Sequence, residues 1–130
     1  MILVDSSVWV EFFSHHPSTV KSRLQMLLDR PREISICGII LQEVLQGIDD
    51  EPRFHQVRSL LLKLPYFPAT RESYLHAVTL SRQIRRRGAV IHTGDALIAA
   101  IALEQDMILF TLDSDFSPIA HYAGLQLFHG

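Results

Sequence analysis

The sequence predicts an α/β fold with a central, mainly parallel sheet. Short apolar runs alternate with longer stretches in which apolar residues recur at helical spacing. The strand candidates are nearly all apolar, as expected for parallel strands that are covered on both faces. With 130 residues, 48% of them hydrophobic, the chain can form a single core, so we expect one domain over residues 1–130.

In the first half of the chain, two strands are expected over residues 2–4 and 33–37. Helical spacing predicts four helices, over residues 8–13, 18–29, 38–48 and 49–64. Pro31 ends the second helix, whereas acids followed by a proline open the fourth. Each strand is therefore followed by helical chain, as in a parallel sheet.

The second half continues the alternation. Two prolines bracket a brief extended segment near residue 66, and a helix follows over 72–87, ended by Gly88. Thr93 is expected to cap the next helix, which has no polar residue from 96 to 103 and should be enclosed by protein. Further elements are expected over 107–110 (strand), 116–122 (a short helical or irregular segment) and 125–128 (final strand).

Composition excludes several classes of protein. The lone Cys37 cannot form an intrachain disulfide, which argues for a reducing, cytoplasmic compartment and against a thiolate metal site. No apolar run approaches the ~18 residues of a membrane helix, and no export signal is visible. The formal charge of −2 does not indicate nucleic-acid binding. Locally, however, four of the twelve basic residues fall within positions 82–87.

Four acids occupy positions where ligands bind in α/β proteins, beyond the carboxyl ends of strands near a reversal of strand order. Asp5 directly follows the first strand, and Asp113 comes shortly after the strand over 107–110. Asp95 falls in the first turn of the apolar helix, and Glu43 interrupts the helix that follows the second strand. We expect these carboxylates to converge at one edge of the sheet.

Converging carboxylates imply a cation, because like charges at close range raise the pKa of at least one carboxyl unless a cation neutralises them. Oxygen ligands without His or Cys spacing favour Mg²⁺ or Mn²⁺ over zinc. Such ions suit phosphodiester hydrolysis, since they activate water, position the phosphate and offset charge on the leaving oxygen. The acids therefore predict a nuclease site.

Simpler structural explanations exist for most of these acids. Asp95 suits the positive end of a helix dipole, and Glu43 suits a solvated helix flank. Asp115 is better explained as an N-cap than as a ligand. Asp5 is harder to explain in this way, because Ser6 or the next serine can cap the following helix.

Other candidate sites are weaker. The histidines are scattered without i, i+4 pairing, and His92 is most simply a loop residue. No Gly-x-Ser-x-Gly elbow or glycine-rich phosphate loop is present. Arg82, Arg85, Arg86 and Arg87 form either a solvated helix end or a contact for RNA phosphates.

Four segments of the chain resemble the acidic motifs of PIN-domain ribonucleases, and more narrowly those of VapC-type toxins of bacterial toxin–antitoxin pairs. These segments are Asp5-Ser6-Ser7-Val8-Trp9, Glu43 in its helix, Gly94-Asp95-Ala96-Leu97-Ile98-Ala99-Ala100 and Thr111-Leu112-Asp113-Ser114-Asp115-Phe116. The resemblance covers essentially the whole chain in order. It implies a PIN-like three-layer α/β/α domain.

By this resemblance, Asp5, Glu43, Asp95 and Asp113 form the catalytic pocket, in which Asp5, Asp95 and Asp113 bind Mg²⁺ or Mn²⁺. Three lesser candidates are Asp115, as a less essential acid, Thr111, as a hydroxyl near the pocket, and Ser6. The resemblance also implies a homodimer, an RNA substrate and an antitoxin whose C-terminal segment covers the pocket. One departure is the helix end at 104–106, where relatives often carry glycine and this chain carries two acids.

The sequence thus predicts a Mg²⁺- or Mn²⁺-dependent endoribonuclease that acts as the toxin of a toxin–antitoxin pair. Two alternatives remain open at this point. One is a non-catalytic PIN-like module that binds a protein, and the other is a metal-dependent DNA nuclease or phosphatase with a similar set of acids.

Overall fold

The computed structural model describes residues 1–129 and confirms the α/β class. Four strands form the sheet: β1 (Ile2–Val4), β2 (Ile34–Cys37), β3 (Tyr66–Phe67) and β4 (Ile108–Phe110). The α-helices within residues 1–129 are α1 (Ser6–Phe12), α2 (Thr19–Leu28), α3 (Gly38–Gln46), α4 (Glu51–Leu61), α5 (Arg71–Arg86), α6 (Thr93–Glu104) and α7 (Ser117–Ala123). Two 3₁₀ turns, η1 (Pro31–Glu33) and η2 (Ser114–Phe116), complete the elements.

The sheet is parallel and has the strand order β3-β2-β1-β4. The chain adds β2 and β3 on one side of β1 and then places β4 on the other side, with Val4 beside Phe110. Strand order therefore reverses between β1 and β4, and the carboxyl ends of these two strands form the edge where α/β proteins bind ligands.

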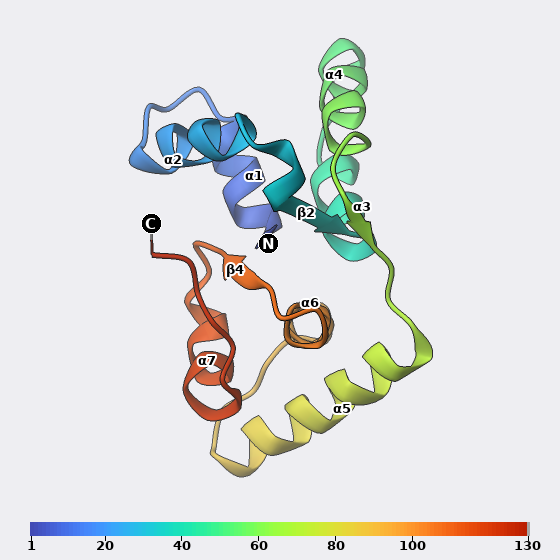
Figure 1. Cartoon of the computed structure of the whole chain (residues 1–130), viewed down its shortest axis with the longest axis vertical. Helices are drawn as coiled ribbons and strands as arrows, with labels where there is room; N and C mark the ends of the chain where they lie inside the picture. Colours follow the sequence, from blue (N-terminus) through green and yellow to red (C-terminus); the bar gives the residue numbers. More distant parts are fainter. Residues whose placement is uncertain (130) are drawn as a thin grey trace.

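The sheet is the middle of three layers (Figure 1). Helices α1 and α2 lie on one side of the strands, and α5, α6 and α7 lie on the other. Helix α1 is held to the sheet by the buried Trp9, whose indole N–H donates to the carbonyl of Val4 at 3.1 Å. The Trp9 ring also stacks on the ring of Phe13, with 6.0 Å between the ring centroids. These contacts of a buried side chain hold α1, and with it the turn after β1, against the sheet.

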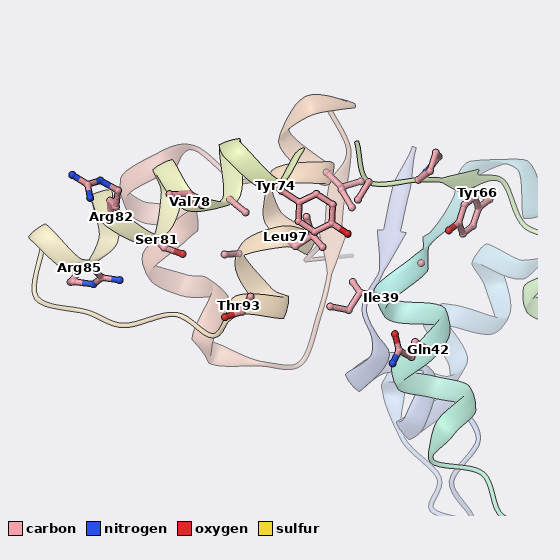
Figure 2. A pocket seen from close by; sticks show the side chains of 16 residues that line it. Ile39, Gln42, Tyr66, Tyr74, Val78, Ser81, Arg82, Arg85, Thr93 and Leu97 are labelled. Atoms are coloured by element: carbon pink, nitrogen blue, oxygen red, sulfur yellow. The ribbon is translucent and has the colours of Figure 1, made fainter. Parts of the chain in front are cut away.

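Helix α6 is the most enclosed helix, as its composition predicts. Every residue from Ala96 to Ala102 is buried. On its flank runs a groove of about 850 Å³, bounded by α3 and β3 on one side and by α5 and α6 on the other (Figure 2). The apolar helix thus supports two neighbouring surfaces, the sheet edge and this groove.

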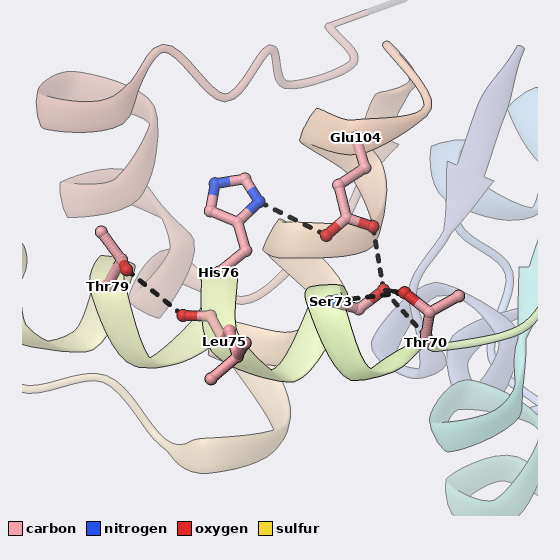
Figure 3. A network of polar contacts seen from close by, with 6 residues as sticks. All are labelled: Thr70, Ser73, Leu75, His76, Thr79 and Glu104. Atoms are coloured by element: carbon pink, nitrogen blue, oxygen red, sulfur yellow. Dashed lines mark hydrogen bonds and ion pairs between the residues drawn. The ribbon is translucent and has the colours of Figure 1, made fainter.

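A polar network ties the start of α5 to the end of α6 (Figure 3). Thr70 and Ser73 form a capping box at the start of α5. The Ser73 hydroxyl then donates to Glu104 Oε2 at 2.9 Å, and His76 Nδ1 lies 3.5 Å from Glu104 Oε1. Glu104 therefore finds partners on α5, which explains an acid at a helix end whose dipole disfavours it.

The same helix end takes a conformation that usually calls for glycine. Asp106 has φ 53°, and within residues 1–129 it is the only non-glycine residue with positive φ. Asp tolerates this left-handed region better than most residues do. The departure from the expected glycine therefore leaves the local turn in place.

Several predicted elements differ in detail. The final strand over 125–128 is wrong as a strand, because only Leu127 forms an isolated bridge, with Leu109. Thr93 is the first residue of α6 and not its cap; the N-cap position is held by His92. Helix α4 is shorter than the predicted 49–64, since it ends at Leu61. Within the described residues, no helix combines the length and hydropathy needed to cross a membrane.

Candidate active site

Asp5 is one of few buried charged or polar residues, with only 4% of its surface exposed. It holds the N-cap position of α1, yet its side chain makes no capping hydrogen bond. Instead, the hydroxyls of Ser7 and Thr111 both donate to Asp5 Oδ2 at 2.8 Å. The carboxylate is therefore held between the first turn of α1, through Ser7, and the segment after β4, through Thr111.

The segment after β4 is joined to the segment after β1 by a chain of hydrogen bonds. The backbone N–H of Asp5 donates to the carbonyl of Phe110 at 2.9 Å, and the N–H of Asp113 donates to Thr111 Oγ1 at 3.0 Å. The Ser7 hydroxyl accepts from the N–H of Leu112 at 3.0 Å. Thr111 thus links Asp5 and Asp113, which are 108 residues apart.

The capping role predicted for Asp115 belongs to Asp113. Asp113 Oδ1 accepts the backbone N–H of Asp115 at 2.9 Å and caps η2. The physical reason is that the helical segment begins two residues earlier than the sequence pattern suggests, with a 3₁₀ turn that starts at Ser114. The Asp115 carboxylate is consequently free to face α6.

Glu43 lies on α3 at the exposed rim of this cluster. The Ser6 hydroxyl donates to Glu43 Oε1 at 3.2 Å. Partial burial, together with the negative charge of Asp5, raises the pKa of Glu43, although the hydrogen bond from Ser6 works in the opposite direction. Ser6 is therefore placed between two of the predicted acids.

Asp95 lies in the first turn of α6, and only 16% of its side chain is exposed. Burial raises its pKa from 3.8 to about 6, and the charges of Asp113, Asp5 and Glu43 contribute in the same direction. Those charges act on Asp95 only because the carboxylates are close together. The predicted convergence of four acids from distant parts of the chain is thus present in the structure.

His92 adds a nitrogen to the cluster. Its Nδ1 lies 3.7 Å from Asp95 Oδ2 and 3.6 Å from Asp115 Oδ2. One ligand atom from each of these three residues lies within 4.8 Å of the other two. His92 was predicted as a loop residue, and the sequence signal for its position is its distance of three residues before Asp95, one helical turn.

The donor set fits a hard divalent cation. The atoms available are carboxylate oxygens of five acids, hydroxyls and one exposed imidazole, and burial together with neighbouring carboxylates raises the pKa of Asp95. Such a cluster can hold a cation and, through it, a phosphate. The arginines lie outside the cluster: Arg82 and Arg85 line the groove of Figure 2, and Arg86 and Arg87 line a smaller hollow beside it.

The match to the PIN domain spans residues 2–122. Ribonuclease VapC11 of Mycobacterium tuberculosis is 31% identical over 129 residues, which covers 97% of this chain and 96% of that protein. VapC ribonuclease Mb1587 of Mycobacterium bovis shows the same identity and coverage.

Solved structures with the same fold include FitAcB from Neisseria gonorrhoeae, with a TM-score of 0.77 and 18% identity over 99% of this chain and 97% of that one. Another is VapBC2 from Rickettsia felis bound to a DNA fragment from its promoter, with a TM-score of 0.79 and 21% identity over 98% of each chain. Together with the match along the sequence, these likenesses show that the chain belongs to the PIN-domain family and is related over nearly its whole length to the VapC ribonucleases.

Proposed function

We propose that the protein is a divalent-metal-dependent endoribonuclease that acts as the toxin of a toxin–antitoxin pair. The observation that carries this proposal is the gathering of carboxylates at the reversal of strand order, where Thr111 links Asp5 to Asp113 and the charges of Asp113, Asp5 and Glu43 add to the effect of burial on the pKa of Asp95. Relatives at 31% identity are named ribonucleases, which directs the proposal to RNA among the phosphodiesters.

In this proposal Asp5, Asp95 and Asp113 hold Mg²⁺ or Mn²⁺, with Asp115 and His92 at the margin of the site. When bound, the cation supplies activated water and charge neutralisation at the scissile phosphate. Glu43 stands apart from that set at the rim. Its raised pKa makes its carboxylate a better acceptor for the proton of an attacking water.

Two hydroxyl groups have a positioning role. Ser7 and Thr111 donate to the same oxygen of Asp5, and Thr111 also accepts the N–H of Asp113. These bonds hold two of the acids in fixed relative positions before any ligand arrives. Preorganisation of this kind lowers the cost of assembling a charged site at the moment of reaction.

An antitoxin is the proposed protein partner, and a homodimer is the proposed assembly in the cytoplasm. Structures with this fold include toxin–antitoxin complexes, among them VapBC-1 from nontypeable Haemophilus influenzae. An antitoxin that places a basic side chain among the acids would satisfy the same uncompensated negative charge that a metal does. Co-expression with the reading frame just upstream of this gene tests the pairing.

Cleavage of end-labelled single-stranded RNA in Mn²⁺, with and without excess chelator, tests the activity. We expect Asp5→Asn to abolish cleavage with the fold intact, and Asp49→Asn, which removes an exposed acid in the loop before α4, to leave it unchanged. Full activity of Asp5→Asn, or activity in chelator, would contradict the proposal. Preferential cleavage of duplex DNA or of phosphomonoesters would instead identify a DNA nuclease or a phosphatase. If the protein neither cleaves RNA nor binds Mn²⁺ saturably, it is a non-catalytic binding module.

A further inference from the structure

The groove between α3, β3, α5 and α6 has a charge opposite to that of the neighbouring site. None of its sixteen lining residues is acidic and two are arginines, although acids outnumber lysines and arginines in the chain as a whole. The groove has no carboxylates, whereas the neighbouring cluster has five, so the two surfaces suit ligands of different charge. One surface suits a cation, and the other suits an anion.

The arginines at one end of the groove are available for an external anion. Arg82 and Arg85 project from the C-terminal half of α5 (Figure 2), and Arg86 follows on the same helix. Among the ion pairs formed within residues 1–129, none involves these three side chains, and residues 79–87 contain no acid. Their charge therefore has no internal function that would compete with a phosphate.

Two exposed aromatic rings line the groove, Tyr74 in its apolar middle and Tyr66 at the end opposite to the arginines (Figure 2). Tyr66 is 53% and Tyr74 56% exposed, and the floor beneath them includes Ile39 and Leu97. Tyr66 is seated against Gly38, where an added Cβ would lie 2.8 Å from the tyrosine hydroxyl. Accessible aromatic rings and arginines without an acidic partner in one groove are the combination that binds unpaired bases and their backbone.

The groove also adjoins the acidic cluster. Two of its lining residues, Gln42 and Thr93, lie on the two helices that carry acids of the site. Gln42 directly precedes Glu43, and Thr93 comes two residues before Asp95. The groove therefore runs along the same two helices, α3 and α6, that carry Glu43 and Asp95.

We infer that this groove is the binding track for a single-stranded segment of the RNA substrate, with bases stacked on Tyr66 and Tyr74 and phosphates held by Arg82 and Arg85. The inference rests on the proposed nuclease function and specifies its substrate. A duplex keeps its bases stacked on one another and cannot offer them to the tyrosines, so the track selects unpaired RNA.

Binding of a labelled single-stranded RNA of about 12 nucleotides, in excess chelator and in an Asp5→Asn background, tests the track without turnover. We expect Tyr74→Ala to weaken binding about fivefold or more, and Tyr74→Phe to retain it, because stacking needs the ring and not the hydroxyl. The double change Arg82→Gln and Arg85→Gln should lower the slope of log affinity against log salt by about 1.4.

The matched control is the pair Arg23→Gln and Arg32→Gln, two exposed arginines on α2 and η1, which should leave the slope unchanged. Unchanged RNA affinity of the tyrosine and arginine variants would overturn the track. So would equal losses with duplex RNA of the same sequence. If sedimentation shows that Tyr74→Ala lowers the mass of the particle, the groove is a contact between two copies of the chain, and the inference is wrong.

The two proposals fail in different ways. If the unaltered protein does not cleave RNA in Mn²⁺ while the groove variants still lose RNA binding, the nuclease function is wrong and the binding track stands. If cleavage is metal-dependent and the groove variants bind as the parent does, the nuclease function stands and the track is wrong.

Discussion

Helix α6 carries a partly buried carboxylate at each end, and their surroundings are opposite. Asp95, in the first turn, faces the charges of Asp113, Asp5 and Glu43. Glu104, in the last turn, accepts a hydrogen bond from Ser73 and has His76 3.5 Å away. The protein thus supplies Glu104 with partners from α5, whereas at the sheet edge the acids around Asp95 outnumber its one nearby histidine, His92.

This difference separates a structural acid from a functional one. The helix dipole favours an acid at the first turn of α6 and disfavours one at the last turn. If the dipole alone acted, the charge of Asp95 would be stabilised and that of Glu104 destabilised. The tertiary contacts reverse that order, because neighbouring carboxylates act on Asp95 while donors from α5 surround Glu104.

The largest expected difference is in activity. Asp95→Asn removes a proposed metal ligand, so we expect RNA cleavage in Mn²⁺ to fall by about a hundredfold or more. Glu104→Gln, at the other end of the same helix, should retain most of the activity. Single-turnover cleavage at saturating Mn²⁺ measures both. Equal losses in the two variants would show that Asp95 acts through the fold and not at the site.

The next effect is on stability at the α5–α6 end. Glu104→Ala removes the hydrogen bond from the Ser73 hydroxyl and the contact with His76, and leaves Thr70 Oγ1 as the remaining acceptor for Ser73, so the free energy of unfolding should fall by about 1 kcal/mol. Gln105→Ala, the exposed neighbour, is the control and should change it by less than about 0.5 kcal/mol. Urea unfolding with chelator present measures both variants. A similar fall in both would assign the loss to the helix end in general.

At the other end, removal of the charge should stabilise the metal-free protein. The folded pKa of Asp95 is raised from 3.8 to about 6, so folding favours the protonated form. This stabilisation is fully present below about pH 4 and is lost as the pH rises through about 6. At pH 7, Asp95→Asn should therefore raise the free energy of unfolding by about 1–2 kcal/mol, after the lost dipole interaction is subtracted.

Urea unfolding of the metal-free protein between pH 4 and pH 7 checks the sign, since the parent should lose stability over this range relative to Asp95→Asn. Saturating Mn²⁺ should reverse the order at pH 7, because the cation binds only when Asp95 is ionised. A parent more stable than Asp95→Asn at pH 7 in chelator would contradict the account of uncompensated charge.

Local sequence patterns predict most of the elements and the places of the four acids within them, because each depends on short spacing. Asp5 and Asp113 are recognisable since each follows a short apolar strand, and parallel strands bring their carboxyl ends together. Ser7 and His92 were not recognised as parts of the site. Their roles depend on contacts with Thr111 and Asp115, which lie far away in the sequence and whose orientation no local pattern specifies.

The end of the chain shows the same limit. Residues 125–128 have the apolar character of a strand, yet only Leu127 pairs with the sheet, through Leu109. The capping residue after β4 also differs from the predicted one by two positions, since it is Asp113 and not Asp115. In both cases the local pattern predicts which type of residue pairs with the sheet or caps the turn. Which particular residue does so depends on how the segment lies against β4.

The smallest expected effect concerns the turn that follows Glu104. Asp106 holds φ at 53°, a conformation in which a residue with a Cβ is strained and glycine is not. Asp106→Gly should therefore raise the free energy of unfolding by about 0.5–1 kcal/mol, partly offset by the greater entropy of glycine in the unfolded chain. Asp106→Ala keeps the Cβ without the polar group and should destabilise the protein, as thermal unfolding of the pair will show. Because Asp106 lies at the end of α6 opposite to the acids, neither change should alter RNA cleavage, and a change in activity would mean that the two ends of the helix are coupled.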